Sequence, residues 1–367
     1  MLRDDSTSSR IDILRFPLIV GVVFIHNYFT TVRLANGSFG VAQNGFWVEF
    51  VRFFISQGVA RVAVPLFFLI SGYLFFLGGW SQDKFISKLK RRVHTLLIPY
   101  LFWNLATLLY HLIGEEIPQT KAFVTGLYIQ DLHTFSLFHN INAWLGITEI
   151  YPVSMQFWFI RDLMVLILFA PVIHFILARK PALPFLLVLF CFWSSLTGPT
   201  FWQNATEALF YFCLGSYLSQ TERNVVYLDK FGSWISAIFL GLLILNSAFP
   251  DSPFILRKVV IIFGVPSVWW LAGLAARNAK WKSWLTELGG ASFFVFAAHE
   301  PLLTIFRKLS YKMFAPTSGA AILALYLLIP ICLITLLVAL HRCLLKTIPS
   351  FLGFITGSSY RFHKQRA

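Results

Sequence analysis

A histidine and an arginine share one face of an apolar segment near the start of the chain. His26 lies eleven residues after Arg15 within residues 11–29, IDILRFPLIVGVVFIHNYF. Eleven residues complete about three helical turns, so the two side chains point the same way, roughly 16 Å apart along the axis. Ionisable groups inside a span are costly and usually mark a functional pathway. The pair therefore predicts a fixed cation that holds one end of a substrate and an imidazole base at the other.

More polar side chains fall inside other apolar segments. At about 1.5 Å per residue from Asp12, His26 lies about 21 Å deep, in the outer half of a bilayer core roughly 30 Å thick. Similar counts bring a further set to the middle or outer half: Arg61, Asn104, Arg161, Asp162, Glu207, His299 and Glu300. Among these we expect Arg61 or Arg161 to stabilise an oxyanion where water is scarce, and His299 to belong to the same catalytic group.

A basic stretch precedes the third apolar segment. Lys88, Lys90, Arg91 and Arg92 lie close together there, followed by His94. With Arg15 they form a cationic inner mouth that suits phosphates. A long, thin donor with a phosphate-rich head, such as an acyl-CoA, would reach from this mouth to His26.

Each candidate has a structural alternative. Arg161 and Asp162 are adjacent and form an interfacial ion pair in that interpretation. Asn104 would hold two helices together, as polar side chains in spans often do, and Glu207 would cap a helix. The basic stretch would be a topology anchor or a contact with anionic lipids. For His26, the shared face with Arg15 favours function.

The elements that must position these groups are membrane-spanning helices. The chain is 57% hydrophobic and 13% charged, and its apolar runs are continuous rather than alternating, which favours helices over a barrel. We expect an all-α integral membrane bundle of about ten spans: 12–33, 57–79, 93–113, 157–177, 182–198, 204–220, 231–249, 256–275, 290–309 and 320–344. The first lacks the short apolar core and the cleavage site of a signal peptide. Residues 1–367 form one domain in this interpretation.

The net charge of +14 is mainly a topology signal. Lysine and arginine gather in alternate loops, which predicts that both termini are cytoplasmic and that residues 345–367 form a short basic cytoplasmic tail. This placement argues against a nucleic-acid partner. Membrane lipids are the expected surroundings. The four cysteines all fall within spans, so no disulfide framework is predicted. Nothing in the sequence fixes an oligomeric state.

Two outward segments stand out among the short loops. Residues 114–156 are long, aromatic and poor in basic residues, as expected for a lid over the membrane mouth. Residues 44–56 place Glu49 and Arg52 among aromatic side chains, which predicts an interfacial amphipathic helix.

Several kinds of site are not predicted. No pair of histidines or carboxylates recurs at a spacing that would face one metal ion on a helix. A glycine-rich phosphate loop and a G-x-S-x-G elbow are also missing from the sequence. The Ser71-Gly72 pair, within a phenylalanine-rich segment, is better explained as a close helix contact.

Taken in order, five stretches resemble the acyltransferase-3 family, the integral-membrane O-acyltransferases of bacteria and some animals. They cover nearly the whole chain: RIDILRFPLIVGVVFIHN, VAVPLFFLISGYLF, KLKRRVHTLLIPYLFW, FWFIRDLMVLILFAPVI and SFFVFAAHEPLL. The resemblance implies transfer of an acyl group, commonly acetyl, from cytoplasmic acyl-CoA to a hydroxyl of a cell-surface polysaccharide or lipid-linked sugar. It also implies the inner membrane of a bacterium.

The family's functional positions correspond to Arg15, His26 and Arg92. The family often has a second arginine three residues after the last of these, where this chain has Thr95. We expect a neighbouring base to substitute: Lys88, Lys90, Arg91 or His94.

The resemblance gives the pair a reaction, in which His26 removes the proton of the acceptor hydroxyl or itself carries the acyl group. The choice between acetyl and a larger group such as succinyl stays open, as does the acceptor. A glycolipid transporter or flippase is the alternative. It would also need intramembrane charges, but it predicts inverted repeats, and no correspondence between two halves is visible.

Overall fold

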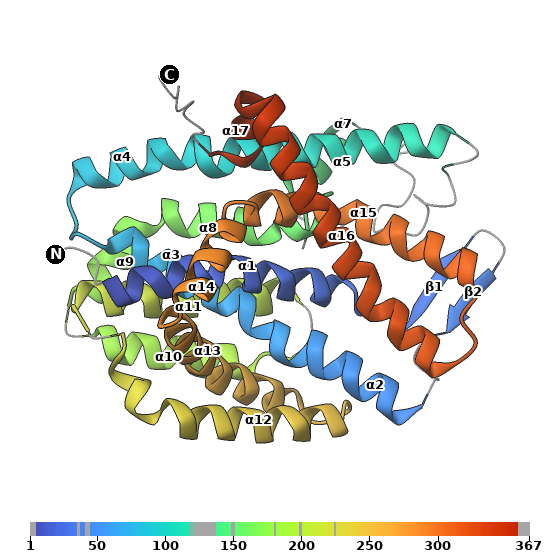
Figure 1. Cartoon of the computed structure of the whole chain (residues 1–367). Helices are drawn as coiled ribbons and strands as arrows, with labels where there is room; N and C mark the ends of the chain where they lie inside the picture. Colours follow the sequence, from blue (N-terminus) through green and yellow to red (C-terminus); the bar gives the residue numbers. More distant parts are fainter. Residues whose placement is uncertain are drawn as a thin grey trace.

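The described residues form a bundle of helices with one short β-hairpin. The computed structural model describes residues 5–34, 37–40, 45–117, 120, 137–147, 151–179, 181–197, 200–223 and 225–358. The hairpin pairs β1 (Thr31–Leu34) with β2 (Gly37–Gly40), antiparallel. It stands at one end of the bundle, and the N-terminus of α1 (Asp5–His26) lies at the other (Figure 1).

The other helices follow in chain order. After the hairpin they are α2 (Phe46–Phe53), α3 (Ala63–Phe76), α4 (Gln82–Arg92), α5 (Ile98–Glu116), α7 (Leu137–Leu145), α8 (Trp158–Leu168), α9 (Ala170–Leu177), α10 (Ala182–Ser195), α11 (Phe201–Gln220), α12 (Gly232–Ala248), α13 (Phe254–Ala276), α14 (Ala279–Gly289), α15 (Ser292–Phe314), α16 (Gly319–Thr347) and α17 (Pro349–Thr356). Each of the ten expected spans overlaps at least one of these helices.

Fewer segments than expected are long and apolar enough to cross a membrane. By length and composition there are five among the described residues: Phe46–Phe76, Gln82–Glu116, Tyr227–Ala248, Phe254–Ala276 and Gly319–Thr347. Two bent pairs, Met155–Leu168 with Ala170–Leu177 and Ala279–Gly289 with Ser292–Phe314, raise the number to seven. The other expected spans fall short because α10 is brief, whereas α1 and α11 carry polar side chains. The chain is thus a multi-pass membrane protein with helical spans.

Two expected boundaries near the start of the chain are wrong. The first helix stops at His26 rather than near residue 33, and the chain turns into the hairpin. The second span begins at Phe46, because α2 continues through a π-helical and a 3₁₀ turn into α3. Residues 46–53 are therefore continuous with the second span. Arg52 is fully buried within the protein.

A close approach between α3 and α11 holds the centre of the bundle. A side chain at Gly72 would collide with the carbonyl of Phe212, and one at Gly215 would collide with the carbonyl of Leu69. Only glycine lets the two backbones come this near. The close contact predicted beside Ser71 is confirmed.

The end of the chain packs on the bundle. Residues 345–347 complete α16, and α17 then lies against α5, where Trp103 Nε1 donates to the Ile355 carbonyl over 2.9 Å. Leu352 and Ile355 are buried. The described part of the predicted tail is therefore helical and packed, and residues 359–367 lie outside the described chain.

The predicted lid is described only in part. Its helix α7 packs on α5, and two hydrogen bonds join them. Tyr100 Oη donates to the Leu145 carbonyl over 2.7 Å, and Trp144 Nε1 donates to the Leu101 carbonyl over 3.1 Å. Residues 121–136, which include Asp131 and His133, lie outside the described residues.

Candidate active site

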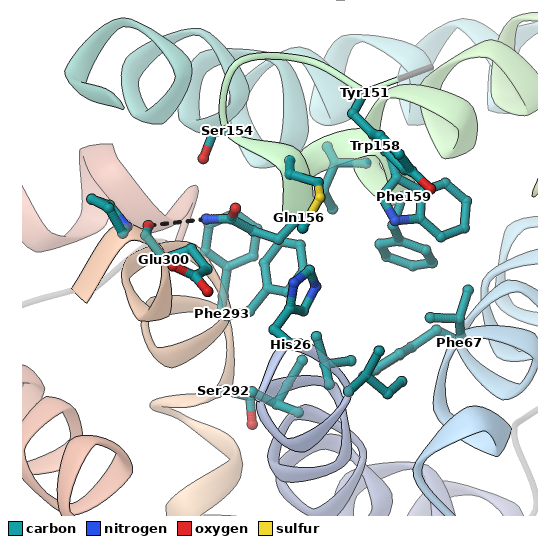
Figure 2. Close-up of a pocket in the computed structure, with 18 of the residues that line it drawn as sticks. His26, Phe67, Tyr151, Ser154, Gln156, Trp158, Phe159, Ser292, Phe293 and Glu300 are labelled. Carbon is teal, nitrogen blue, oxygen red and sulfur yellow. Dashed lines mark hydrogen bonds between the residues drawn. The ribbon is translucent and has the colours of Figure 1, made fainter. Parts of the chain in front are cut away.

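A large cavity runs through the bundle beside α1. Its volume is about 730 Å³ and its lining includes Arg15, His26 and Arg61, with Glu300 and Arg307 beyond them. The structure therefore brings four of the residues singled out in the sequence, Arg15, His26, Arg61 and Glu300, to one cavity. Figure 2 shows His26 at the end of α1, with Gln156 and Glu300 on one side and Tyr151 and Phe159 on the other.

Arg15 and His26 line this cavity from a single helix. α1 is continuous from Asp5 to His26, even though Pro17 lies within it. Arg15 is about half exposed and lies 3.2 Å from Asp12 in an i,i+3 pair. The shared face follows from helical geometry, because residues eleven apart fall nearly in line. Arg15 marks one end of the cavity and His26 lies well inside it.

Side chains from other elements secure the last turn of α1. A helix end leaves four carbonyls without a partner inside the helix. Ser56 Oγ donates to the Phe24 carbonyl over 2.5 Å, and Arg52 donates to the carbonyl of Phe29, three residues beyond the helix end. Arg307 contacts the His26 carbonyl at 3.3 Å. These bonds fix the backbone that carries the imidazole of His26.

His299 lies against His26 from the facing helix. The two ring centroids are 5.1 Å apart, with an edge-to-face angle of 61°. His299 is completely buried, and its Nδ1 lies 2.7 Å from the Phe296 carbonyl. A carbonyl only accepts, so Nδ1 carries the proton and Nε2 is left as an acceptor.

A break in α15 creates the pocket wall next to this pair. Glu300 has non-helical backbone angles, and Pro301 follows it. Proline has no N–H, so the Ala297 carbonyl loses its helical partner. Gln156 Nε2 replaces that partner at 3.1 Å and also reaches the Glu300 carbonyl at 3.2 Å. Figure 2 shows the second of these bonds.

Arg61 enters the cavity from an irregular part of the second span. It lies in a 3₁₀ turn, Val59–Val62, that follows the π-helical turn Phe54–Gly58. Irregular turns of this kind inside helices are frequent at functional sites. Its guanidinium donates two hydrogen bonds to Gln57 Oε1, from Nε over 2.9 Å and from Nη2 over 2.6 Å. Its exposed surface faces the cavity.

Arg161 takes a different place. Its Nε donates to Asp162 Oδ1 over 2.9 Å and its Nη1 to the Gly146 carbonyl over 2.8 Å. It is not among the residues that line the cavity. The geometry thus favours the ion-pair interpretation of Arg161 and leaves Arg61 as the one of the two oxyanion candidates that lines the cavity.

The basic stretch does not line the cavity either. It occupies α4 and the turn after it, at the end of the bundle opposite the hairpin (Figure 1). Lys88 is tied to the carbonyls of Phe75 and Leu77. Lys90, Arg91 and His94 are exposed, and Arg92 is half-buried.

One contact joins that stretch to the Arg15 end of the cavity. Gly357 lies so close to the turn after α4 that a Cβ there would sit 2.5 Å from the Cα of Thr95. The next residue, Ser358, lines the cavity together with Arg15 and Gly289. Exposed cations therefore stand near the Arg15 end without forming its wall.

Several lining residues escaped the sequence analysis. Arg307 was not singled out, although it falls within the ninth expected span, 290–309, and α15 runs on to Phe314. Gln57 and Gln156 were not considered, although a Gln-x-x-x-Arg spacing from 57 to 61 places both side chains on one helical face. Pro301 was the available signal for the break in α15.

No metal centre is apparent among the described residues, where three or more histidines, cysteines or acids do not gather at one point. All four cysteines are free. The chemistry available to the cavity is that of two imidazoles, His26 and His111, three guanidinium groups and one carboxylate.

Comparisons with known proteins place this chain in a family. A family model described as an acyltransferase domain, acyltransferase 3, matches residues 8–341. The chain is also 29% identical over 371 residues to the succinoglycan biosynthesis protein ExoH of Rhizobium meliloti strain 1021, covering 97% of this chain and 93% of that protein. No solved structure matches. The match favours an enzyme over the transporter alternative, and the chain belongs to the acyltransferase-3 family of membrane acyltransferases.

Proposed function

We propose that the protein transfers an acyl group, most simply acetyl, from cytoplasmic acyl-CoA to a hydroxyl of a cell-surface polysaccharide or a lipid-linked sugar. The observation that carries this proposal is a single cavity lined by Arg15 at one end and by His26 deep inside. A thioester donor is long and thin, with its phosphates at the end remote from the reacting carbonyl. The cavity offers a cation and a base at a matching separation.

The donor would enter at the Arg15 end. Arg15 is half exposed there. The basic residues in and after α4 lie close to Ser358 at the cavity wall: Lys88, Lys90, Arg91, Arg92 and His94. Guanidinium groups bind phosphate oxygens through charge-assisted hydrogen bonds. In this arrangement the phosphates stay near the surface and the pantetheine arm extends along α1 to His26.

The transfer step uses the groups around His26. The imidazole takes the proton of the acceptor hydroxyl, and the hydroxyl oxygen attacks the thioester carbonyl. Arg61 stabilises the negative charge on the carbonyl oxygen. The carbon–sulfur bond then breaks, and the CoA thiolate leaves with the proton from His26. A covalent acyl-histidine would use the same residues in two steps.

The distribution of basic residues and the relationship to ExoH support the proposed membrane location and orientation. The positive-inside pattern supports cytoplasmic termini and a cytoplasmic Arg15 end in the inner membrane of a bacterium. The relative ExoH is named for succinoglycan biosynthesis, a polysaccharide context. That name supports a glycan acceptor for this chain.

The test compares surface glycans by mass spectrometry in cells that lack the gene and carry either the wild-type protein or His26→Ala. We expect acylated glycans with the wild type and none with the variant at equal membrane expression. His174→Ala is a matched control, because His174 is also half-buried but lies outside the cavity lining. Unchanged glycan acylation with His26→Ala would overturn the proposal.

A further inference from the structure

Arg307 has no role in the proposed transfer. It lines the cavity beyond His26, and its Nη1 and Nη2 contact the His26 carbonyl at 3.3 Å and Thr304 Oγ1 at 3.0 Å. Its guanidinium carbon lies 4.5 Å from the centre of the Phe29 ring. A guanidinium has five N–H donors, so these two bonds leave three that can serve a ligand.

The charge of Arg307 is not matched by an ion pair in the described chain. Glu300 also lines the cavity, but no salt bridge joins its carboxylate to Arg307. Among the described residues, Arg61 likewise has no carboxylate partner within ion-pair distance, and its hydrogen bonds go to Gln57. The cavity thus presents three arginines against one carboxylate. Charges within a bundle are expensive unless paired, and they mark ligand pathways.

We propose that Arg307 forms a subsite for a carboxylate that lies a few bonds from the reacting carbonyl. This inference rests on the proposed function, since it adds a second recognition element to the same cavity. Arg15 serves the donor phosphates and Arg61 the oxyanion, so the guanidinium beside the His26 backbone is free to bind an anion of the substrates. A carboxylate matches the planar fork of an arginine through two parallel hydrogen bonds.

Two sources supply this chemistry. The carboxylate is the far end of a dicarboxylic acyl group, such as succinyl, or it belongs to an acidic sugar of the acceptor. In both cases it sits next to the reaction centre, because Arg307 contacts the residue that carries the base.

The purely structural alternative is that Arg307 only caps the end of α1. A cation at a helix C-terminus stabilises its free carbonyls. Such a cap would support every ligand equally, whereas a subsite would discriminate by charge. The experiment therefore measures a ratio between two ligands that differ by one carboxylate.

Binding is measured with purified His26→Ala protein in lipid nanodiscs, so that no turnover occurs. The two probe pairs are acetyl-CoA against succinyl-CoA, and methyl glucoside against methyl glucuronide. We expect the charged member of one pair to bind about 10- to 100-fold more tightly than its neutral partner, the range for hydrogen bonds to a charged group. Adding Arg307→Gln should bring that ratio close to one. The pair that shows the preference identifies the source.

Arg342→Gln, added to His26→Ala in the same way, is the control. Arg342 is exposed and pairs with Glu287 at 2.8 Å, and its removal should keep the preference. Equal binding within both pairs would overturn the proposal, and so would an equal loss for charged and neutral probes in Arg307→Gln. Release of CoA by the wild-type protein is measured separately. Charge preference without any turnover would refute the acyl transfer and leave the subsite standing.

Discussion

The imidazole rings of His26 and His299 meet edge to face, with centroids 5.1 Å apart, on two helices that are far apart in the sequence. His299 donates from Nδ1 to the Phe296 carbonyl, and its Nε2 is buried without a hydrogen-bond partner in the described part of the chain. A base oriented by a third group is a recurrent arrangement in nucleophilic catalysis. His299 packs directly against the His26 ring, and we expect it to hold that ring in position.

We expect His299→Phe to lower kcat by about 10- to 100-fold, since a small misplacement of a catalytic group has effects of that size. His299→Gln should recover part of the loss, because the unpartnered Nε2 is available to accept a bond from His26 once that imidazole is protonated, and a glutamine oxygen offers the same acceptor. The measurement is acyl transfer by purified protein, with KM for acyl-CoA recorded alongside.

A structural role alone would give another result. It would lower the stability of both variants, and the glutamine would rescue nothing. A KM for acyl-CoA that rises while kcat stays constant would also contradict the orienting role.

Arg15 is expected to bind the donor without taking part in the proton transfer. Arg15→Ala should weaken CoA binding about tenfold or more, because hydrogen bonds between charged groups are roughly twice as strong as neutral ones. His26→Ala should bind CoA nearly as well as the wild type. A titration of CoA into nanodisc-embedded protein measures both.

Arg277→Ala is the control for charge alone, since Arg277 is an exposed arginine that does not line the cavity. If Arg277→Ala weakened CoA binding as much as Arg15→Ala, the effect would come from net charge. The assignment of Arg15 to the donor phosphates would then be wrong.

Gln156 supports the break in α15 and should contribute to stability. Gln156→Ala leaves the Ala297 and Glu300 carbonyls without their side-chain donor, and each unsatisfied buried group costs roughly 1–3 kcal/mol. We expect a lower thermal midpoint for the solubilised protein and reduced transfer. Gln82→Ala, on the exposed start of α4, should change neither. An unchanged midpoint for Gln156→Ala would show that water replaces the lost bonds.

Much of this arrangement was accessible from the sequence, because helical periodicity is local. The spacing of Arg15 and His26 was enough to place them on one face, and the Ser-Gly pair at 71–72 was enough to predict a close contact. Arg61 could be placed near the same depth by counting residues along its span.

What escaped the sequence depends on contacts between distant segments. Arg52 was expected in a helix at the membrane interface, but its side chain is fully buried within the protein. It pairs with Glu49 at 2.9 Å and donates to the carbonyl of Phe29. Arg161 was an oxyanion candidate by depth, yet its bond to Gly146 turns it away from the cavity. Depth along a helix is set by the sequence, whereas the direction of a side chain among several helices is set by its partners.

The approach of α3 to α11 gives the sharpest test of the packing. Gly72→Ala would place a methyl group against the Phe212 carbonyl, and Gly215→Ala one against the Leu69 carbonyl. Overpacking of this kind costs typically about 1–3 kcal/mol, so both variants should lower the thermal midpoint.

Gly241→Ala is the matched control on α12, because nothing lies within 4 Å of a Cβ at that position. Alanine is favoured over glycine inside a helix, and the control should keep or slightly raise the midpoint. Equal midpoints for Gly72→Ala and Gly241→Ala would mean that α3 and α11 are not in direct backbone contact.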